Sequence, residues 1–348
     1  MNKETTRIGL VGYGAWGRHH AKSISTIRDV ELVAVASRSP ESVALAEKEF
    51  PGISGSTDYR ELVANPAVDV VDIVVPTHLH TEIAAAALET GKHVILEKPM
   101  AATVAECDRL IAAAKRSGSV LTIVHEMRVS PQWAAIKRII DEGGIGRPQY
   151  AMLNLFRFPY RSGAGNWRYD RSTVGSWILE EPIHFYDLLL WYFEQNGAPE
   201  SVNAHGTSRL DGRGMYENFS SVVRFRSGEF AVVAQSLGGF EHHQVVEVVG
   251  TAGSVRSLWS GAMDRTDKPV FSVLHQRGDD RTPVPVTVPT GSGEVLELQL
   301  FLEKSVAAIR SGAPYYAPET ERRLIELCIA ADESAAAGKE IRLPDYPS

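Results

Sequence analysis

From Arg7 onward, apolar runs of strand length alternate with amphipathic stretches of helix length, and this alternation limits the chain to few folds. Because the runs are apolar throughout, each strand is expected to be covered on both faces. Such strands joined by helices predict a parallel, doubly wound sheet. The predicted strands cover 7–14, 30–37, 68–76, 93–99 and 120–126, and the predicted helices cover 16–27, 40–50, 80–91 and 103–118.

The pattern changes after Glu126. A predicted helix at 130–144 is followed by stretches in which polar and apolar residues alternate, as in half-buried strands. The clearest covers 218–236, where Ser227 and Gly228 predict a hairpin turn. We therefore predict an α/β protein with a dinucleotide-binding Rossmann domain at 1–126 and a second α/β domain at 127–348, built on a large, open, mainly antiparallel sheet. Its other predicted elements are strands at 149–158, 245–259 and 269–276 and a last helix at 319–338 that closes the chain.

Composition excludes several classes of protein. The chain has 348 residues, of which 44% are hydrophobic and 23% charged, values typical of two globular domains. A net charge of -7 argues against general affinity for nucleic acid or an acidic membrane surface. No long apolar run or signal-peptide pattern occurs, which predicts a cytoplasmic protein with a small-molecule partner. Cys107 and Cys328 are expected to be core thiols.

A glycine motif lies between the first predicted strand and the first predicted helix. Gly12, Gly14 and Gly17 form G-x-G-x-x-G, which enclose Ala15 and Trp16 and predict a pyrophosphate-binding turn.

The residues after the second predicted strand bear on the choice of cofactor. An acidic residue there would bind the ribose hydroxyls of NAD, whereas this chain has Ser37 and Arg38, which suit a 2′-phosphate. NADP is therefore favoured over NAD. The alternative is that Arg38 stacks on adenine or points to solvent, with NAD bound.

Six stretches together resemble the Gfo/Idh/MocA family of nicotinamide-dependent sugar oxidoreductases, over nearly the whole chain. The most specific is Glu97-Lys98-Pro99 after a predicted strand. The resemblance implies a Rossmann domain followed by an α/β domain whose open sheet forms the interface of a homodimer or homotetramer. The matching stretches are GLVGYGAWG, the segment from VDVVDIVVP to HVILEKPMA, GGIGRP, GSWILEEPIHFYD, VVGTAGSV and SGAPYYAPETERRLIEL.

The resemblance also implies roles for individual residues. Lys98 would donate a hydrogen bond to the reacting hydroxyl, and Glu97 would fix the local geometry near the cofactor. His184 would be the general base, with Glu180 as its carboxylate partner four residues earlier on one helical face. Glu181 is an alternative partner. Pro182 departs from the family pattern, since a proline restricts a helix to starting near that point. A further segment would contact the cofactor through Pro76, Thr77, His78 and His80, with a structural role as the alternative for the two histidines.

The expected substrate side combines arginines with an aromatic ring. Trp167 would stack on a sugar ring, and Arg128, Arg157, Arg168 and Glu181 would bind its polar groups. Arg161 and Arg171 lie in the same stretch, so an anionic substrate is an open alternative to a neutral one. No compact ligand motif such as H-E-x-x-H occurs, and no metal site is expected.

Three functions fit these residues. The first is an NAD(P)-dependent sugar dehydrogenase or reductase that transfers a hydride between a secondary hydroxyl and nicotinamide. The second is a redox-neutral glycosidase or lyase that uses tightly bound NAD(P) for transient sugar oxidation. A cofactor-binding regulator without catalysis is the third, and the presence of both Lys98 and His184 argues against it.

Overall fold

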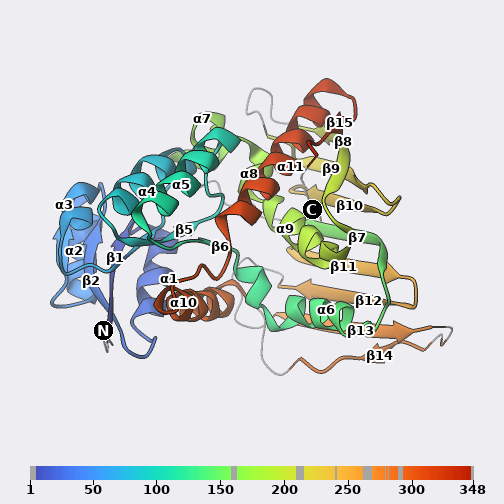
Figure 1. The fold of residues 1–348 in the computed structure, drawn as a ribbon, viewed down its shortest axis with the longest axis horizontal. Coiled ribbons are helices and arrows are strands. Elements are labelled where there is room, and N and C mark those ends of the chain that lie inside the picture. The colour runs from blue at the N-terminus through green and yellow to red at the C-terminus, as the bar shows by residue number, and fades with distance from the viewer. Residues whose placement is uncertain are drawn as a thin grey trace. The chain divides into compact units, whose positions relative to one another are not determined.

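The chain folds into two compact units (Figure 1). The first comprises Met1–Glu126 and Leu298–Arg323, and the second comprises Met127–Glu297 and Leu324–Ser348. This computed structural model describes residues 5–157, 163–208, 215–239, 241–261, 269–278, 280, 282–288 and 293–345.

In the described part of the first unit, six parallel strands form one sheet in the order β3-β2-β1-β4-β5-β6. The strand order reverses between β1 and β4, and sheets of this type bind ligands beyond the carboxyl ends of the strands at such a reversal. The strands are β1 (Thr6–Val11), β2 (Val30–Ala36), β3 (Ser54–Ser56), β4 (Val70–Ile73), β5 (His93–Glu97) and β6 (Leu121–Val124).

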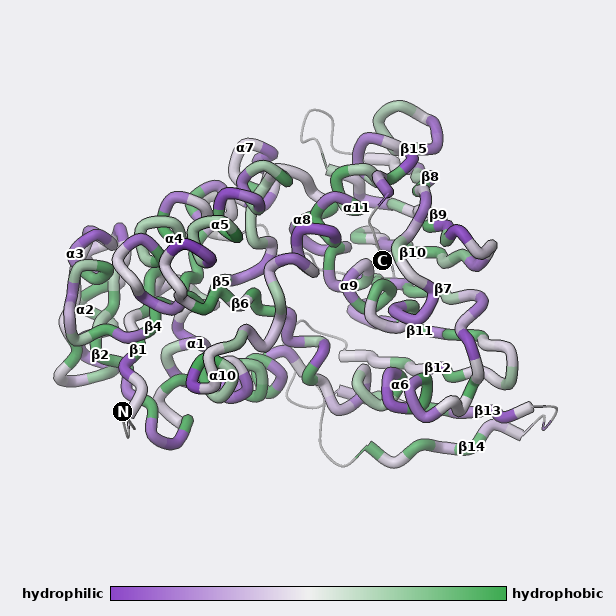
Figure 2. Tube along the Cα trace, viewed as in Figure 1, coloured by the Kyte–Doolittle hydropathy of each residue, from purple (hydrophilic) through white to green (hydrophobic). Residues whose placement is uncertain are grey.

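Helices cover both faces of this sheet. Figure 1 shows α4 and α5 on one side and α1 on the other, so β4 and β6 are buried along their whole length and consist mostly of hydrophobic residues (Figure 2). The predicted doubly wound fold is confirmed, although β3 and α3 were not predicted. The helices are α1 (Ala15–Ile24), α2 (Pro40–Glu49), α3 (Tyr59–Ala64), η1 (Thr77–Leu79), α4 (His80–Glu89) and α5 (Val104–Ser117).

The ends of α5 show why the helix signals in the sequence were reliable. The Thr103 hydroxyl accepts a hydrogen bond from the backbone N–H of Glu106 and donates one to its carboxylate. At the other end, Gly118 adopts the left-handed conformation that suits glycine after a helix. Both caps depend only on neighbouring residues, so the sequence alone predicts them.

The second unit contains a mixed sheet of nine strands among the residues that the structure describes, in the order β14-β13-β12-β11-β7-β10-β9-β8-β15. Neighbouring strands in this sheet are antiparallel, except for β7 and β10, which are parallel. The prediction of a mainly antiparallel sheet is thus confirmed. The hairpin between β9 and β10 turns at Ser227 and Gly228, where Gly228 has a φ of +101°. The strands are β7 (Pro148–Phe156), β8 (Pro199–Thr207), β9 (Asn218–Phe225), β10 (Phe230–Ser236), β11 (His243–Gly250), β12 (Gly253–Ser260), β13 (Val270–Arg277), β14 (Val284–Pro285) and β15 (Ile341–Arg342).

One face of this sheet packs against helices α6 and α9. From α6, the Gln132 amide donates to the Ser257 hydroxyl at 2.6 Å, and from α9 the Tyr186 hydroxyl lies 2.6 Å from the Ser221 hydroxyl. The helical segments between residues 126 and 196 are η2 (Glu126–Val129), α6 (Pro131–Asp141), η3 (Ala164–Tyr169), α7 (Arg171–Val174), α8 (Trp177–Glu180), α9 (Ile183–Tyr192) and η4 (Glu194–Asn196).

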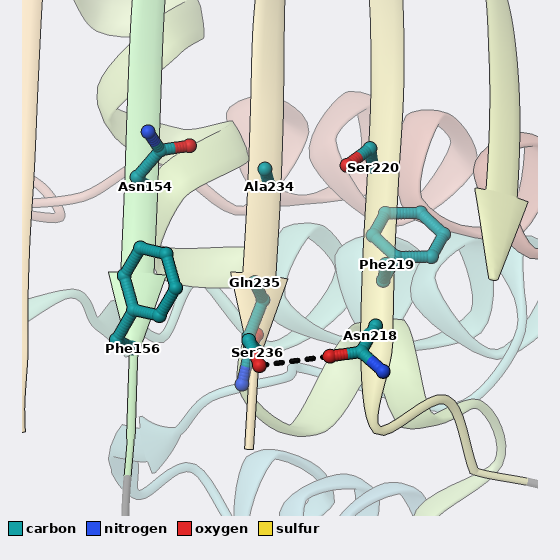
Figure 3. Close-up of a pocket in the computed structure, with 8 residues that line it drawn as sticks. All are labelled: Asn154, Phe156, Asn218, Phe219, Ser220, Ala234, Gln235 and Ser236. Atoms are coloured by element: carbon teal, nitrogen blue, oxygen red, sulfur yellow. Dashed lines mark hydrogen bonds between the residues drawn. The ribbon is translucent and has the colours of Figure 1, made fainter. Parts of the chain in front are cut away.

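The other face carries a pocket on β7, β9 and β10 (Figure 3). The Ser236 hydroxyl donates to the Asn218 side-chain oxygen at 2.8 Å along its edge. None of the residues predicted to bind cofactor or substrate lines it. The lining residues are Asn154, Phe156, Asn218, Phe219, Ser220, Ala234, Gln235 and Ser236.

The domain boundaries differ from the expected ones in one segment. The whole of 127–348 was assigned to the second domain, but Leu298–Arg323 groups with the first unit. This segment contains most of helix α10 (Glu294–Arg310), which was not predicted, and the start of α11 (Pro318–Ala337).

Long-range hydrogen bonds explain this grouping. Arg310 donates to the Thr6 hydroxyl and to the Asp29 carbonyl, while the Tyr316 backbone exchanges hydrogen bonds with the Thr122 hydroxyl. These partners are about 200 to 300 positions apart in the sequence, so no local sequence pattern predicts their contacts. Cys107 of the first unit and Cys328 of the second are buried, as expected of core thiols.

Candidate functional site

The glycine motif follows β1 and opens α1. Gly12 has a φ of +102°, and a Cβ atom there would lie 2.0 Å from the Val74 carbonyl oxygen. A Cβ on Gly17 would lie 1.9 Å from the carbonyl oxygen of Gly12. Gly14, the residue before α1, is exposed and has open space around its Cβ position. Two glycines are thus required for packing, and the third leaves the helix N-terminus accessible to a pyrophosphate, as a dinucleotide requires.

Ser37 and Arg38 lie directly after β2, next in the sheet to β1. The Ser37 backbone N–H donates to the Ser56 carbonyl at 3.0 Å, which holds this turn to β3. Arg38 is exposed and makes no hydrogen bond or ion pair with any described residue. The guanidinium is therefore available to an anion at the end of β2.

Lys98 follows the last residue of β5, Glu97, at the carboxyl end of the same sheet. Lys98 is half-buried, and Glu97 is 7% exposed. The Glu97 carboxylate accepts hydrogen bonds from the Trp16 indole at 2.8 Å and from the Lys98 backbone N–H at 3.1 Å, and it lies 2.9 Å from Nε2 of His20. Burial would raise the pKa of Glu97, but the His20 contacts, the indole and the charge of Lys98 hold it below its ordinary value.

Two further groups hold the backbone after Lys98. The His80 ring has Nδ1 at 2.7 Å from the Pro99 carbonyl oxygen and Nε2 at 2.8 Å from that of Val75. The Met100 N–H donates to the Glu321 carboxylate at 3.1 Å. His80 is buried, which favours the structural role given above as its alternative, whereas His78 is exposed. Thr77 is buried and Pro76 is half-buried, directly before η1.

The second unit carries the other predicted catalytic residues, and here one expectation was wrong. Glu180 and His184 do not share a continuous helix, because α8 ends at Glu180 and α9 begins at Ile183. Pro182 lies immediately before α9, as expected of a residue that tolerates only the first turn. His184 is half-buried in the first turn of α9, whereas Glu180 and Glu181 are buried.

The predicted substrate arginines are ion-paired. Arg168 Nε lies 2.8 Å from the Glu180 carboxylate, and Arg157 forms an ion pair with the Glu181 carboxylate. Arg157 is 7% exposed, which makes its pair a buried one.

Arg128 is held in a similar way. Its guanidinium donates three hydrogen bonds to the buried Asp187 carboxylate, at 2.7 to 3.1 Å, and lies over the Trp191 ring. Trp167 is half-buried in η3 with the Arg168 guanidinium 5.5 Å from its ring centre. Arg161 lies outside the described residues.

The predicted site residues therefore divide between the two units. The cofactor set and Lys98 lie at the carboxyl ends of neighbouring strands of the first sheet, whereas Glu180, His184 and the substrate set lie in the second unit. Three buried residues around the Lys98 segment were not predicted: His20, Asp72 and Glu321. One signal was available for Asp72, since an acidic residue within an otherwise apolar strand is costly without a partner.

The described residues also bear on metal binding and membrane insertion. Among these residues, no group of three or more His, Cys, Asp or Glu side chains is arranged to hold a metal ion. None of the helices in the described ranges has the length and apolar character needed to cross a membrane.

Comparison with known proteins identifies the family. Residues 6–125 match the model of an oxidoreductase family with an NAD-binding Rossmann fold, Gfo/Idh/MocA, and residues 133–256 match the C-terminal domain of the same family. The 1,5-anhydro-D-fructose reductase of Ensifer adhaerens is 31% identical, covering 80% of this chain and 83% of the relative.

A second relative aligns over almost the whole length. The levoglucosan dehydrogenase of Pseudarthrobacter phenanthrenivorans is 27% identical, covering 98% of this chain and 99% of the relative. A solved structure of a levoglucosan dehydrogenase with NADH and levoglucosan is 26% identical, with a TM-score of 0.81, over 98% of this chain and 99% of that one. The resemblance inferred from the sequence is thus confirmed, and the chain belongs to the Gfo/Idh/MocA family of NAD(P)-binding oxidoreductases.

Proposed function

We propose that this protein is a dehydrogenase or reductase of a sugar or related polyol, with Lys98 and His184 as its catalytic residues. The observation that carries the proposal is the arrangement of the first unit. The glycine turn, with open space at Gly14, follows β1, and Lys98 follows β5, and only β4 lies between these two strands in the sheet. The nicotinamide cofactor, when bound, accepts or supplies the hydride. The names of the relatives do not favour the glycoside-cleaving alternative.

Each catalytic residue has one task in the oxidation direction. The Lys98 ammonium donates a hydrogen bond to the reacting hydroxyl oxygen and stabilises the negative charge that develops there. The His184 imidazole takes the hydroxyl proton as general base. Glu97, held by hydrogen bonds from three groups, keeps its negative charge beside Lys98.

The ion pairs of the second unit favour a neutral substrate. Arg128, Arg157 and Arg168 each face a carboxylate, so their charges are already compensated before any ligand binds. A sugar acid or sugar phosphate would have to displace a buried carboxylate from its arginine, which is costly. Hydroxyl groups of a neutral sugar can instead hydrogen-bond to the paired arginines and carboxylates without separating them, and Trp167 offers an apolar ring face.

We also propose a preference for NADP, carried by Arg38. The exposed guanidinium after β2 suits a 2′-phosphate, and the described part of this turn has no acidic residue to repel one. Arg38→Ala should raise the KM for NADP by about tenfold or more and leave the KM for NAD within about twofold, as expected for loss of one charge-assisted contact. An equal effect on both cofactors would refute the preference.

A homodimer or homotetramer would use the outer face of the nine-stranded sheet. Four apolar side chains of this face in the described strands are more than a third exposed: Val222, Phe230, Leu258 and Val270. We expect Leu258→Asp to lower the mass measured by light scattering, and Leu45→Asp, at an exposed leucine of α2, to leave it unchanged. A monomeric parent protein would exclude the interface. The cytoplasmic location remains a prediction from the sequence.

The function is tested by a mass balance. The purified protein is incubated with NADP or NAD and a panel of neutral and anionic sugars, polyols and glycosides, and substrate loss is compared with the reduced nicotinamide formed. Equal amounts of both indicate a dehydrogenase, whereas substrate loss without reduced nicotinamide indicates redox-neutral cleavage.

The same assay tests Lys98. Lys98→Ala should lower turnover by about 10²–10⁴-fold, the usual contribution of such a group, with cofactor binding retained. Lys115→Ala, at an exposed lysine of α5 paired with Glu319, is the control and should keep full turnover. Full activity of Lys98→Ala would refute the catalytic assignment.

A further inference from the structure

A buried histidine of α1 lies between two carboxylates from neighbouring strands. His20 Nδ1 is 2.8 Å from an oxygen of Asp72 in β4, and Nε2 is 2.9 Å from an oxygen of Glu97 at the end of β5. The side chains of His20 and Asp72 are completely buried, and that of Glu97 is 10% exposed. The proposed chemistry uses neither His20 nor Asp72, although burying two carboxylates and an imidazole together is costly unless they compensate one another.

The geometry defines the charge of the ring. A neutral imidazole donates from one nitrogen only, and two ionised carboxylates can both accept from the ring only when both nitrogens carry a proton. Burial acts to lower the pKa of His20, but the charges and hydrogen bonds of Asp72 and Glu97 outweigh it and raise the pKa to about 10. The ring is therefore an imidazolium at neutral pH.

Four charges then follow one another in alternating sign. Asp72 is negative, His20 positive, Glu97 negative and Lys98 positive, so the set has no net charge, and each buried charge has an opposite neighbour. The titratable groups that face the ring in the described residues are Asp72 from β4 and Glu97 from β5, with Lys98 beyond Glu97. Trp16 of α1 adds its indole donor to the same Glu97 oxygen.

We propose that Asp72, His20 and Glu97 form a buried relay that holds the Glu97 carboxylate ionised and in place beside Lys98, with His20 as a positioning residue for that lysine. This inference rests on the proposed function of Lys98. Without the His20 charge, Glu97 would keep only neutral donors and the lysine, and its orientation would no longer be tied to the inside of the sheet. A displacement of about 1 Å at a catalytic group can cost about 10²-fold in rate.

The charge of the ring can be measured without any turnover. In full-length protein labelled with ¹⁵N-histidine, the His20 signals are assigned from their loss in His20→Gln. We expect both ring nitrogens to be protonated at pH 7 to 9. A ring that is neutral at pH 8, or that titrates near the ordinary histidine value of about 6.5, would overturn the relay, whether or not Lys98 proves to be catalytic.

The positioning role needs a kinetic test. His20→Gln should lower kcat by about 10- to 100-fold, with the KM values for cofactor and substrate within about twofold. The matched control is His93→Gln, at the other end of β5, where the ring accepts a hydrogen bond from the Val120 backbone. His93→Gln should keep kcat. Equal losses of kcat in the two variants would reduce His20 to a packing role.

A second variant leaves Glu97 and Lys98 untouched. Asp72→Asn removes one of the two charges that hold the His20 proton, so the ring should deprotonate at a lower pH. The ratio of kcat for Asp72→Asn to kcat for the parent should then fall about tenfold between pH 7 and 9, the change expected when the imidazolium is lost. A ratio that is constant with pH would contradict the proposal, because a purely structural defect does not follow the titration of the ring.

Discussion

The surroundings of Lys98 in the first unit and of His184 in the second are built differently. Around Lys98, charged side chains from α1, β4 and β5 form one continuous chain of contacts. Near His184 in the sequence, carboxylates of the α8–α9 region are each neutralised separately, Glu180 by Arg168 and Glu181 by Arg157. The first arrangement couples its charges, whereas the second compensates them pair by pair.

The backbone explains this difference. The carboxyl ends of adjacent parallel strands lie side by side. The residues that follow β1, β4 and β5 are therefore close together, whatever the conformations of the loops. In the second unit, the corresponding residues lie on short helices and turns, where α8 has four residues and a proline separates it from α9. A functional residue on such segments depends on individual side-chain pairs for its position.

The largest expected effect separates the tasks of the two units. His184→Asn should lower kcat by about 10²–10⁴-fold, while cofactor affinity, measured by fluorescence titration, stays within about twofold, because the cofactor residues lie in the first unit. His205→Asn, at an exposed histidine of β8, is the control. A loss of cofactor affinity as large as the loss of turnover would contradict this division of tasks.

The pairwise compensation of the second unit can be broken at one partner. Arg157→Leu leaves the Glu181 carboxylate buried without its arginine and should lower the free energy of unfolding by about 3–5 kcal/mol. The double variant Arg157→Leu/Glu181→Leu should recover most of that loss in urea denaturation. Arg60→Leu removes an exposed arginine with exposed carboxylate partners and should cost about 1 kcal/mol or less. A double variant as unstable as the single one would exclude separate compensation.

Two glycines sharpen the role of the backbone in the first unit. Gly17→Ala would place a Cβ 1.9 Å from the Gly12 carbonyl oxygen and should destabilise the protein by about 1–3 kcal/mol or more. The Cβ added in Gly14→Ala would lie in open space, so the melting temperature of this variant should stay within a few degrees of that of the parent. Its affinity for the cofactor should nevertheless be lower. Equal melting temperatures for Gly17→Ala and the parent would show that the turn can relax.

The last prediction concerns the stability of the protein as a function of pH. The pKa of His20 rises from 6.5 to about 10 on folding, so the stabilisation from its proton is complete below pH 6.5 and is lost as the pH rises through 10. The difference in unfolding free energy between the parent and His20→Gln should therefore shrink from pH 6.5 to pH 10. Urea denaturation at several pH values measures it. A difference that does not vary with pH would mean that His20 is not charged in the folded protein.

Sequence alone was sufficient for the fold class and for the motif residues. The apolar strands, the caps of α5, the glycine turn and the position of Lys98 after β5 all follow from neighbouring residues and from periodicity. Local signals of this kind can be recognised in the sequence without knowledge of the fold, because they depend on the conformation of a few adjacent residues. The start of α9 directly after Pro182 belongs to the same class.

Only the tertiary structure decided which distant residues meet. His20 contacts Asp72 and Glu97 across 52 and 77 positions, and Glu321 reaches the Met100 N–H across 221. The grouping of Leu298–Arg323 with the first unit and the pairing of Arg157 with Glu181 have the same origin. Periodicity and spacing describe neighbouring residues and do not predict such contacts. The contacts form only when the packing of strands and helices buries distant charged groups next to each other.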